Sequence, residues 1–486
     1  MPNAFASLML MTWPLVCLLL LRRLPLERAL IWCILGAYLL LPPKAEFDLP
    51  LIPPMDKKSI PSLSVAMILV LVLRVRPELW PRSRVAAGLV VMYVFGVVLT
   101  VLTNGDPVVY SDPVDANTFF RLPGLRLHDT LSAVVDKAIV LIPFLLGRQL
   151  LGSDKGLREL LLALAIGGLA YSLPALIEVR LSPQVNVWVY GFFQHDFEQM
   201  MRQGGFRPIV FLPHALWLAL FMLSALLAMT ALARQATGSR QIQFFFATLY
   251  LAAVLYLCKS LATQAYALAV LPLALFAGPR LTLRVTAIMA LIAVSYPILR
   301  QLELIPLDAI LERSAAIDPE RAKSLAYRFT NEEILLERAR EKPWFGWGGW
   351  GRNLLLDPGS GAVETIPDGR WIIVFGTFGW LGYIAEMGLL ALPLVLLWWR
   401  SRRGVSPVSA AVALILAVTM IDMLLNATLV PLIWMCAGAL LGYAEQLRAS
   451  APGRNQSTPL SPPKPEPLFG SGPVIGQRSD RRNWRK

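Results

Sequence analysis

Residues 209–233 read IVFLPHALWLALFMLSALLAMTALA, a run of twenty-five positions without Asp, Glu, Lys or Arg. A helix needs about 20 apolar residues to cross the hydrocarbon core of a bilayer, so this run is long enough to span a membrane. The whole chain shares its bias. Of the 486 residues, 56% are hydrophobic and 16% are charged, whereas soluble domains carry about 25% charged residues. The sequence therefore predicts an all-α polytopic membrane protein.

Outward from this run, the hydropathy of the chain predicts twelve further spans. Together with the first run, the predicted spans are 4–21, 29–42, 62–73, 85–103, 131–147, 159–179, 209–233, 243–261, 263–277, 285–300, 371–399, 408–425 and 429–444. The segments 29–42 and 62–73 are short, and we expect them to tilt or to thin the bilayer locally. The chain is thus expected to hold about 12–13 transmembrane helices.

Basic residues gather in every second connection. Each of these connections is the short loop that follows every second span. The basic residues are Arg22, Arg23, Arg28, Arg74, Arg76, Arg82, Arg84, Arg148, Lys155, Arg158, Arg234, Arg240, Arg280, Arg284, Arg400, Arg402 and Arg403. Positively charged loops stay in the cytoplasm, so the N-terminus is predicted outside and the C-terminus in the cytoplasm. This topology accounts for the net charge of +13, and no nucleic-acid partner is expected.

The longest connection, 301–370, is predicted to face outward. It has nine Lys/Arg and twelve Asp/Glu and is too long for a plain connector, so it should contain short helices. Thr330-Asn331-Glu332-Glu333 matches a capping box, which predicts a helix that begins there and stops at Lys342-Pro343. The expected parts are a helix bundle over 1–300, this loop over 301–370, helices over 371–446 and a disordered, basic, cytoplasmic tail that attracts membrane lipid over 447–486.

The loop contains EKPWFGWGGWGRNLLL, residues 341–356, where only aromatic residues and glycine lie between Trp344 and Trp350. GWGGWG has the spacing of a dinucleotide-binding fingerprint, but that motif needs a preceding strand and a βαβ unit. Here a charged helix and a proline precede it, which excludes a nucleotide fold. Two interpretations stay open. The tryptophans form an aromatic belt at the membrane surface, or the glycines let the backbone approach a ligand whose sugars or isoprenoid chain pack on the rings.

Two more polar stretches lie at the outer mouths of spans. Arg202 and Arg207 are placed to clamp a phosphate, because the guanidinium fork matches phosphate oxygens. The alternative is that both arginines snorkel to the membrane surface. Asp368 and Arg370 lie at the mouth of the span 371–399, where an ordinary helix start is the alternative.

Ionisable side chains inside spans are costly, so they are candidates for function or pair with one another inside the bundle. They are Asp136, Lys137, Lys259, Glu386 and Asp422. The four cysteines all fall in apolar runs and are predicted to be small buried side chains rather than disulfides. With three scattered histidines, no metal site is predicted.

Taken together, these pieces resemble the O-antigen ligase and O-antigen polymerase superfamily, and within it the polymerases of bacterial exopolysaccharide. The shared order is an Arg-Pro turn at Arg207, two spans joined by a tight outer turn, a long outer loop with Arg328 ahead of a helix, and the last helices. The motifs that carry the resemblance are Lys342-Pro343-Trp344-Phe345-Gly346-Trp347-Gly348, Asp368 and Gly379-Trp380-Leu381-Gly382. It covers most of residues 200–445.

Ligases of this superfamily use a histidine eleven residues before a Gly-x-x-Gly motif. Counting back from Gly379 leads to Asp368, so that histidine is absent, which favours a polymerase. The resemblance implies a donor glycan on undecaprenyl pyrophosphate, a lipid-linked acceptor and transfer at the outer face of the bacterial inner membrane. It implies no metal and no cofactor. Chain-length regulators and export proteins are the partners it suggests.

The resemblance also implies residue roles. Arg207 and Arg328 match the arginines that hold the pyrophosphate in the family, and Asp368 stands where the base is expected. The further candidates for substrate contact are Arg202, Arg370, Trp344, Gly346, Trp347, Gly348 and Lys259.

Other function classes stay open. One is ligase-type glycan transfer. Another is a transporter or flippase for a lipid-linked glycan, which predicts internal repeats and broken midplane helices, and no convincing repeat is found. A third is a glycosyltransferase that uses a lipid monophosphate sugar, for which Asp48 and Asp56 are available in the first outer loop. The last is a structural role in an exopolysaccharide machine.

Overall fold

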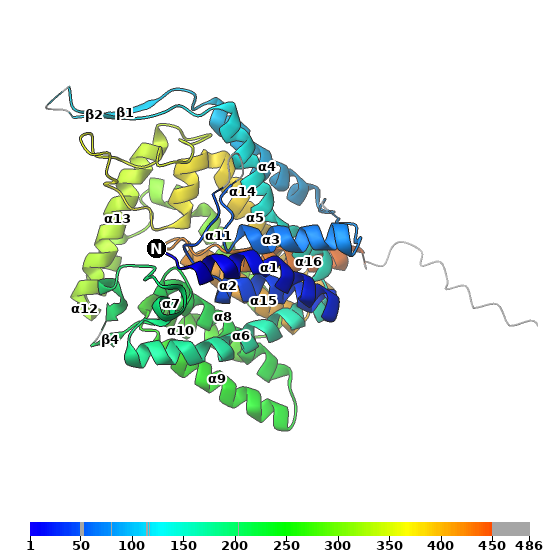
Figure 1. Ribbon diagram of the computed structural model, residues 1–486. Helices are drawn as coiled ribbons and strands as arrows, with labels where there is room; N and C mark the ends of the chain where they lie inside the picture. Colours follow the sequence, from blue (N-terminus) through cyan, green and yellow to red (C-terminus); the bar gives the residue numbers. More distant parts are fainter. Residues whose placement is uncertain (49–52, 79, 113–114, 116, 203, 450–486) are drawn as a thin grey trace, which may run out of the picture. The chain divides into compact units, whose positions relative to one another are not determined.

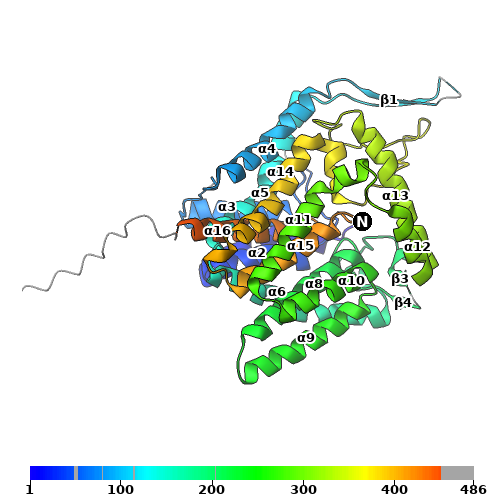
Figure 2. The ribbon, with the colours of Figure 1, turned by 180° about the vertical axis from the view of Figure 1, so that it is seen from behind.

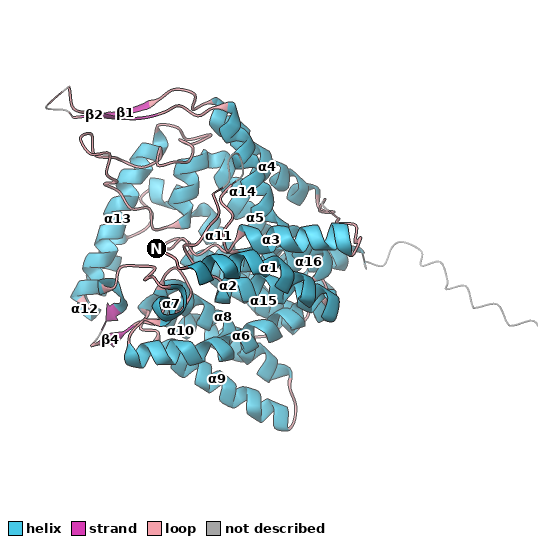
Figure 3. Cartoon of the chain, in the orientation of Figure 1, coloured by secondary structure: helices cyan, strands magenta, loops and turns pink. Residues whose placement is uncertain are grey.

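The computed structural model of the chain describes residues 1–48, 53–78, 80–112, 115, 117–202 and 204–449. These residues form sixteen α-helices and two small antiparallel hairpins (Figure 1, Figure 3). The predicted all-α fold class is confirmed. Most of the predicted tail, 450–486, lies outside the described residues.

Each of the thirteen predicted spans coincides with a helix. These helices are α1 (Ala4–Arg23), α2 (Leu26–Leu40), α3 (Ser59–Met67, continued by a π-helical turn, Ile68–Val72), α4 (Arg84–Leu102), α5 (Leu127–Leu150), α6 (Asp154–Leu181), α8 (Ala215–Gln235), α9 (Ser239–Leu257), α10 (Leu261–Phe276), α11 (Pro279–Gln301), α14 (Arg370–Arg400), α15 (Pro407–Asp422) and α16 (Pro431–Ala449).

The remaining elements lie in the connections. They are α7 (Val185–Tyr190), α12 (Leu307–Ile317), α13 (Pro319–Arg340), two 3-10 turns (Glu198–Met200 and Ser401–Arg403), the hairpin of β1 (Val108–Ser111) with β2 (Phe119–Leu122), and the hairpin of β3 (Met201–Arg202) with β4 (Gly205–Phe206).

Eight of the described helices are long and apolar enough to cross a membrane, namely α1, α4, α5, α6, α8, α9, α11 and α14. Three apolar helices are shorter, and these are Ser59–Val72, α10 and α15. The chain is therefore a multi-pass membrane protein. The side of the membrane on which each connection lies stays a prediction from the arginines.

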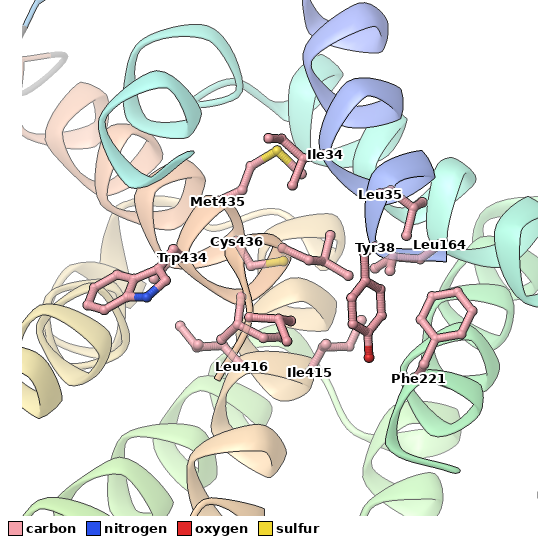
Figure 4. Packing of buried hydrophobic residues seen from close by; sticks show 14 of the residues in the cluster. Ile34, Leu35, Tyr38, Leu164, Phe221, Ile415, Leu416, Trp434, Met435 and Cys436 are labelled. Carbon is pink, nitrogen blue, oxygen red and sulfur yellow. The ribbon is translucent and has the colours of Figure 1, made fainter. Parts of the chain in front are cut away.

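The core lies where α8, α15 and α16 meet the surrounding helices (Figure 1, Figure 2). In α8, 89% of the apolar window is buried, which explains why the run at 209–233 is apolar on every side. Figure 4 shows the same packing from close by, with Tyr38 of α2 and Phe221 of α8 beside Ile415 of α15. The four cysteines are buried and unpaired, as predicted.

The structure of the segment between α11 and α14 contradicts one prediction. It holds two helices, and α13 begins at Pro319 rather than at Thr330. The Thr330 hydroxyl donates a hydrogen bond to the Ala326 carbonyl inside α13 (3.1 Å), so Thr330 is no cap and the predicted capping box is wrong. The start is set instead by Asp318, whose carboxylate accepts the Glu320 N–H (3.1 Å), followed by a proline in the first turn.

The loop after α13 docks on a break in α14. The backbone of α14 leaves helical geometry at Gly379 (φ 62°, ψ −162°), which frees carbonyl and N–H groups inside the helix. The aromatic loop forms hydrogen bonds with these groups: Trp347 N–H donates to the Gly376 carbonyl (2.9 Å), and Trp380 N–H donates to the Pro343 carbonyl (2.8 Å). The predicted ligand-facing glycine loop is therefore paired with the protein's own backbone.

Two glycines make this approach possible. A Cβ on Gly346 would lie 2.4 Å from the Thr377 carbonyl group, and a Cβ on Gly379 would lie 2.4 Å from that of Trp344. Both glycines also have positive φ, which other residues adopt only with strain. No side chain fits at either position without separating the loop from α14.

We therefore expect Gly346→Ala and Gly379→Ala each to destabilise the protein by about 2–4 kcal/mol, the sum of backbone strain and overpacking. Gly349→Ala is the matched control, because nothing lies within 4 Å of its Cβ position. Thermal unfolding of the purified protein in detergent measures the difference. Equal midpoints for Gly379→Ala and Gly349→Ala would contradict the docking account.

Candidate functional site

Arg328 and Asp368 form an ion pair where α13 meets the start of α14. The Arg328 Nε lies 3.3 Å from Asp368 Oδ2, and the two side chains are 24% and 31% exposed, so solvent reaches the pair. Arg328 Nη1 also donates to the Leu425 carbonyl (3.3 Å) and to Asn426 Oδ1 (3.2 Å). Two residues that the sequence places 40 positions apart are thus held together.

Asp422 supports the Arg328–Asp368 pair indirectly, through Asn426. Its carboxylate accepts hydrogen bonds from Asn426 Nδ2 (2.9 Å) and the Thr428 hydroxyl (2.8 Å) at the end of α15. Because Asn426 in turn accepts from Arg328, the buried carboxylate fixes the amide that orients the guanidinium. Asp422 therefore acts through Asn426, not by pairing with another ionisable group.

Glu332 holds α13 in place one turn beyond Arg328. It is buried and accepts the Trp371 Nε1–H (3.2 Å), and Arg300 Nε lies 4.0 Å from its second oxygen. Burial raises its pKa to about 7, against the opposing effects of Trp371 and Arg300. The contacts tie α13 to both α14 and α11.

A second group of polar residues lies in the segment between α6 and α8. Arg207 is buried and follows the hairpin of β3 with β4, and its backbone N–H donates to the Met200 carbonyl (2.8 Å). His195 and His214, which the sequence analysis did not select, stack edge to face with ring centroids 4.4 Å apart. The charges that act on His214 include those of Arg207, Arg328 and Arg202. The two arginines implied by the resemblance therefore lie in one region, near the histidine pair.

The histidines are neutral hydrogen-bond donors in this environment. His214 caps α8, since its Nδ1 accepts the Leu216 N–H (3.0 Å), and His195 Nδ1 accepts the Asp196 N–H (2.7 Å). A ring nitrogen that accepts a backbone N–H carries no proton, so each Nε2 carries it. Burial first, and then the neighbouring cations, lower the pKa of His214 to about 3. His214 therefore offers an N–H rather than a base.

Lys259 and Arg202 belong to the same region but in a supporting role. Lys259 lies in the turn between α9 and α10 with φ 50°, and its Nζ donates to the Arg202 carbonyl (3.1 Å). A Cβ on Gly205 would lie 2.3 Å from that Nζ, so the lysine packs directly under the hairpin. Lys259 thus supports the hairpin that carries Arg202 and precedes Arg207.

Arg370 lies close to the Arg328–Asp368 pair, since its backbone N–H donates to the carbonyls of Met423 (2.8 Å) and Asn426 (3.3 Å), but its side chain binds elsewhere. Its Nε and Nη2 bind the two oxygens of the fully buried Glu386 at 2.6 and 2.7 Å, a bidentate pair within α14. Lys137 lies nearby, over the rings of Tyr93 (4.8 Å) and Phe378 (4.1 Å). The structure thus places Arg370, a predicted substrate contact, in an internal ion pair, and for Glu386 the pairing interpretation is confirmed.

The tryptophans of the aromatic loop have different surroundings. Trp344 is 67% exposed, whereas Trp347 is 8% exposed and stacks on the Arg338 guanidinium at 3.5 Å. Gly348 N–H donates to the Thr377 carbonyl of α14 (2.9 Å). Of the predicted contacts in this loop, Trp344 is the side chain that the structure leaves accessible, and Trp347 belongs to the loop's own core.

Arg352, which sequence reasoning missed, is the buried anchor of the region around the aromatic loop. It is 1% exposed and donates to the carbonyls of Trp347, Pro123 and Asp106 at 2.6–3.1 Å. The guanidinium thereby joins the aromatic loop to the connection between α4 and α5. No sequence signal separates it from the other arginines, because its partners are backbone carbonyls.

Comparison with protein-family models finds no match for this chain, and comparison with curated proteins finds none either. The site is therefore interpreted from its own geometry and from the resemblance in its motifs.

We expect His214 to stay neutral between pH 5 and 8, because protonation would place a further cation beside the arginines. Nitrogen NMR of the protein labelled in histidine should show a proton on Nε2 throughout this range. His214→Asn, which retains a capping side chain, identifies the signal. A titration of that signal near the ordinary histidine pKa of about 6.5 would contradict the assignment.

Proposed function

We propose that the chain joins oligosaccharide repeat units by transferring a glycan from undecaprenyl pyrophosphate to a sugar hydroxyl. The product is an exopolysaccharide or O-antigen, made at the outer face of the bacterial inner membrane. The observation that carries the proposal is the Arg328–Asp368 pair, with Arg207 and two neutral histidines in the same region. A cationic site with one partly exposed carboxylate, at the mouths of membrane helices, suits a lipid-linked pyrophosphate and a hydroxyl acceptor.

Arg207 and Arg328 hold the pyrophosphate in this account. They lie on separate elements, since Arg207 follows the hairpin of β3 with β4 and Arg328 lies on α13. The neutral N–H groups of His195 and His214 add donors without adding positive charge. As the bond to the pyrophosphate breaks, negative charge grows on the leaving oxygen, and fixed donors stabilise that charge.

Asp368 takes the proton. The acceptor hydroxyl oxygen attacks the anomeric carbon, the bond from that carbon to the pyrophosphate oxygen breaks with its electron pair, and the hydroxyl proton passes to the Asp368 carboxylate. Burial raises the pKa of Asp368, against the opposing charge of Arg328, which makes the carboxylate a better base than an exposed aspartate. The products are the elongated glycan and the free lipid pyrophosphate.

Arg207→Ala and Arg328→Ala should each abolish polymer while the protein still accumulates in the membrane. Lysine at either position should also be impaired, because a point charge does not reproduce the guanidinium fork. Arg284→Ala, on the exposed face of α11, is the control. Polymer is measured by gel from membranes of cells that express each variant. A normal yield from either alanine variant would remove that arginine from the site.

Asp368→Asn should lower the transfer rate by about 10²–10⁴-fold, the usual contribution of a general base. In the unchanged protein, kcat/KM should fall as the pH drops through the raised pKa of Asp368, since protonation removes the base. The acid limb should therefore lie above the ordinary aspartate pKa of about 3.9 and disappear in the variant. Glu364→Gln, an exposed neighbour, is the control. An unchanged acid limb in Asp368→Asn would assign the base elsewhere.

A further inference from the structure

A cavity of about 350 Å³ lies beside the region of Arg207, Arg328 and the two histidines, which we call the arginine region. Its walls come from α2, the connection between α2 and α3, α8 and the start of α16. The side chains that matter for its chemistry are Lys44, Asp56, Lys58, Tyr38, Trp217 and Pro213. Its volume falls within the range of about 300–1,000 Å³ that is common for small-ligand sites. No part of the proposed transfer step uses it.

The cavity carries a surplus of positive charge. Its lining holds Lys44, Lys57 and Lys58 against Asp56, whose Oδ1 accepts the N–H groups of Lys58 (2.8 Å) and Ser59 (2.9 Å) at the start of α3. The buried Lys57 ammonium is held by the carbonyls of Leu41 (2.9 Å) and Phe211 (3.0 Å) and forms part of the wall. Lys44 and Lys58 are exposed, and within the described part of the chain neither forms a salt bridge. Both are therefore available to an anionic ligand.

The walls between these lysines are flat and apolar. The Trp217 ring has Lys58 Nζ 5.9 Å from its centroid, and the Tyr38 ring has Lys57 Nζ at the same distance. Aromatic faces suit the C–H faces of a sugar ring better than they suit a compact inorganic anion. The combination of rings and lysines points to a sugar that carries a negative charge.

The cavity adjoins the proposed transfer site. Pro213 in its wall immediately precedes His214, and the charge of Lys44 acts on His195. Val430 and Pro431 also line the cavity, and they follow closely after Thr428, which binds the Asp422 carboxylate that positions Arg328 through Asn426. A glycan seated in the cavity would therefore present its neighbouring unit to the arginine region.

We infer that this cavity is an acceptor subsite that binds an acidic sugar, with Lys44 and Lys58 on its carboxylate and Trp217 against its ring. The inference rests on the proposed function, because it takes the bound chain to be the acceptor of the transfer. It adds a substrate class: a repeat unit that contains a uronic acid or a similarly charged sugar.

The test is direct binding to the purified, full-length protein in detergent. The probes are cellobiouronic acid, which is a glucuronic acid linked to glucose, and cellobiose, its neutral counterpart. Calorimetric titration should show at least tenfold tighter binding of the acid at low salt. The double variant Lys44→Gln/Lys58→Gln should lose that preference, and Lys155→Gln, an exposed lysine paired with Glu27, should keep it. The unchanged protein, the double variant and Lys155→Gln should all have the same midpoint of thermal unfolding.

Three results would overturn the inference. One is equal affinity for the acid and cellobiose in the unchanged protein. Another is a preference that survives in Lys44→Gln/Lys58→Gln. Inorganic phosphate that competes as well as the acidic disaccharide would also overturn it, since the lysines would then form a general anion site.

The binding test is independent of turnover, so the two proposals fail separately. Selective binding of the acid by a protein that transfers no lipid-linked glycan would refute the proposed function and support an acidic-sugar site. Conversely, turnover without acid-selective binding would leave the transfer reaction standing and refute the subsite.

Discussion

The contact that anchors the segment between α13 and α14 is the backbone-to-backbone approach of the aromatic loop and the break in α14. Gly346 lies against the Thr377 backbone of α14 and Gly379 lies against the Trp344 backbone of the loop, so closely that neither glycine accommodates a Cβ. This contact fixes where α13 leaves the bundle surface and where α14 enters it. Arg328 lies on α13 and Asp368 lies just before α14, so the pair bridges the two helices that this segment connects. The docked loop and the Glu332–Trp371 hydrogen bond together set how these two helices meet.

The polar groups around the Arg328–Asp368 pair have different electrostatic roles. Asp422 orients Arg328 through Asn426, and Glu386 neutralises Arg370 within the helix. His214 stays uncharged because its burial, and then the charges of the neighbouring arginines, lower its pKa, and its Nδ1 caps α8. The positive charge left for an anionic substrate is therefore concentrated on a few side chains. An assembly of this kind stabilises a leaving pyrophosphate without a rearrangement of charge during the reaction.

Much of the fold could be predicted from the sequence, because hydropathy in a membrane protein is a strong signal. All thirteen apolar runs are helices, although the run at 209–233 becomes helical only at Ala215, after the turn that holds His214. The start of α13 was missed because Asp318-Pro319 competes with the capping pattern at Thr330.

The site was predicted less completely, since it depends on contacts between distant segments. Arg328 and Asp368 were selected and do meet, whereas Arg370 and Trp347 are engaged inside the protein. His195 and His214 were passed over because nothing local shows that their rings touch. Their one sequence signal was position, in an outer connection and at the mouth of a span.

The most direct measurement is turnover by the purified protein in liposomes. It would receive an oligosaccharide repeat on a polyprenyl pyrophosphate, without nucleotide sugar, and the products would be sized on a gel. The account predicts a ladder of products spaced by one repeat. A single product of one transfer would indicate ligase-type chemistry instead. Movement of the intact lipid-linked glycan between leaflets, with no new glycosidic bond, would contradict the account and identify a transporter.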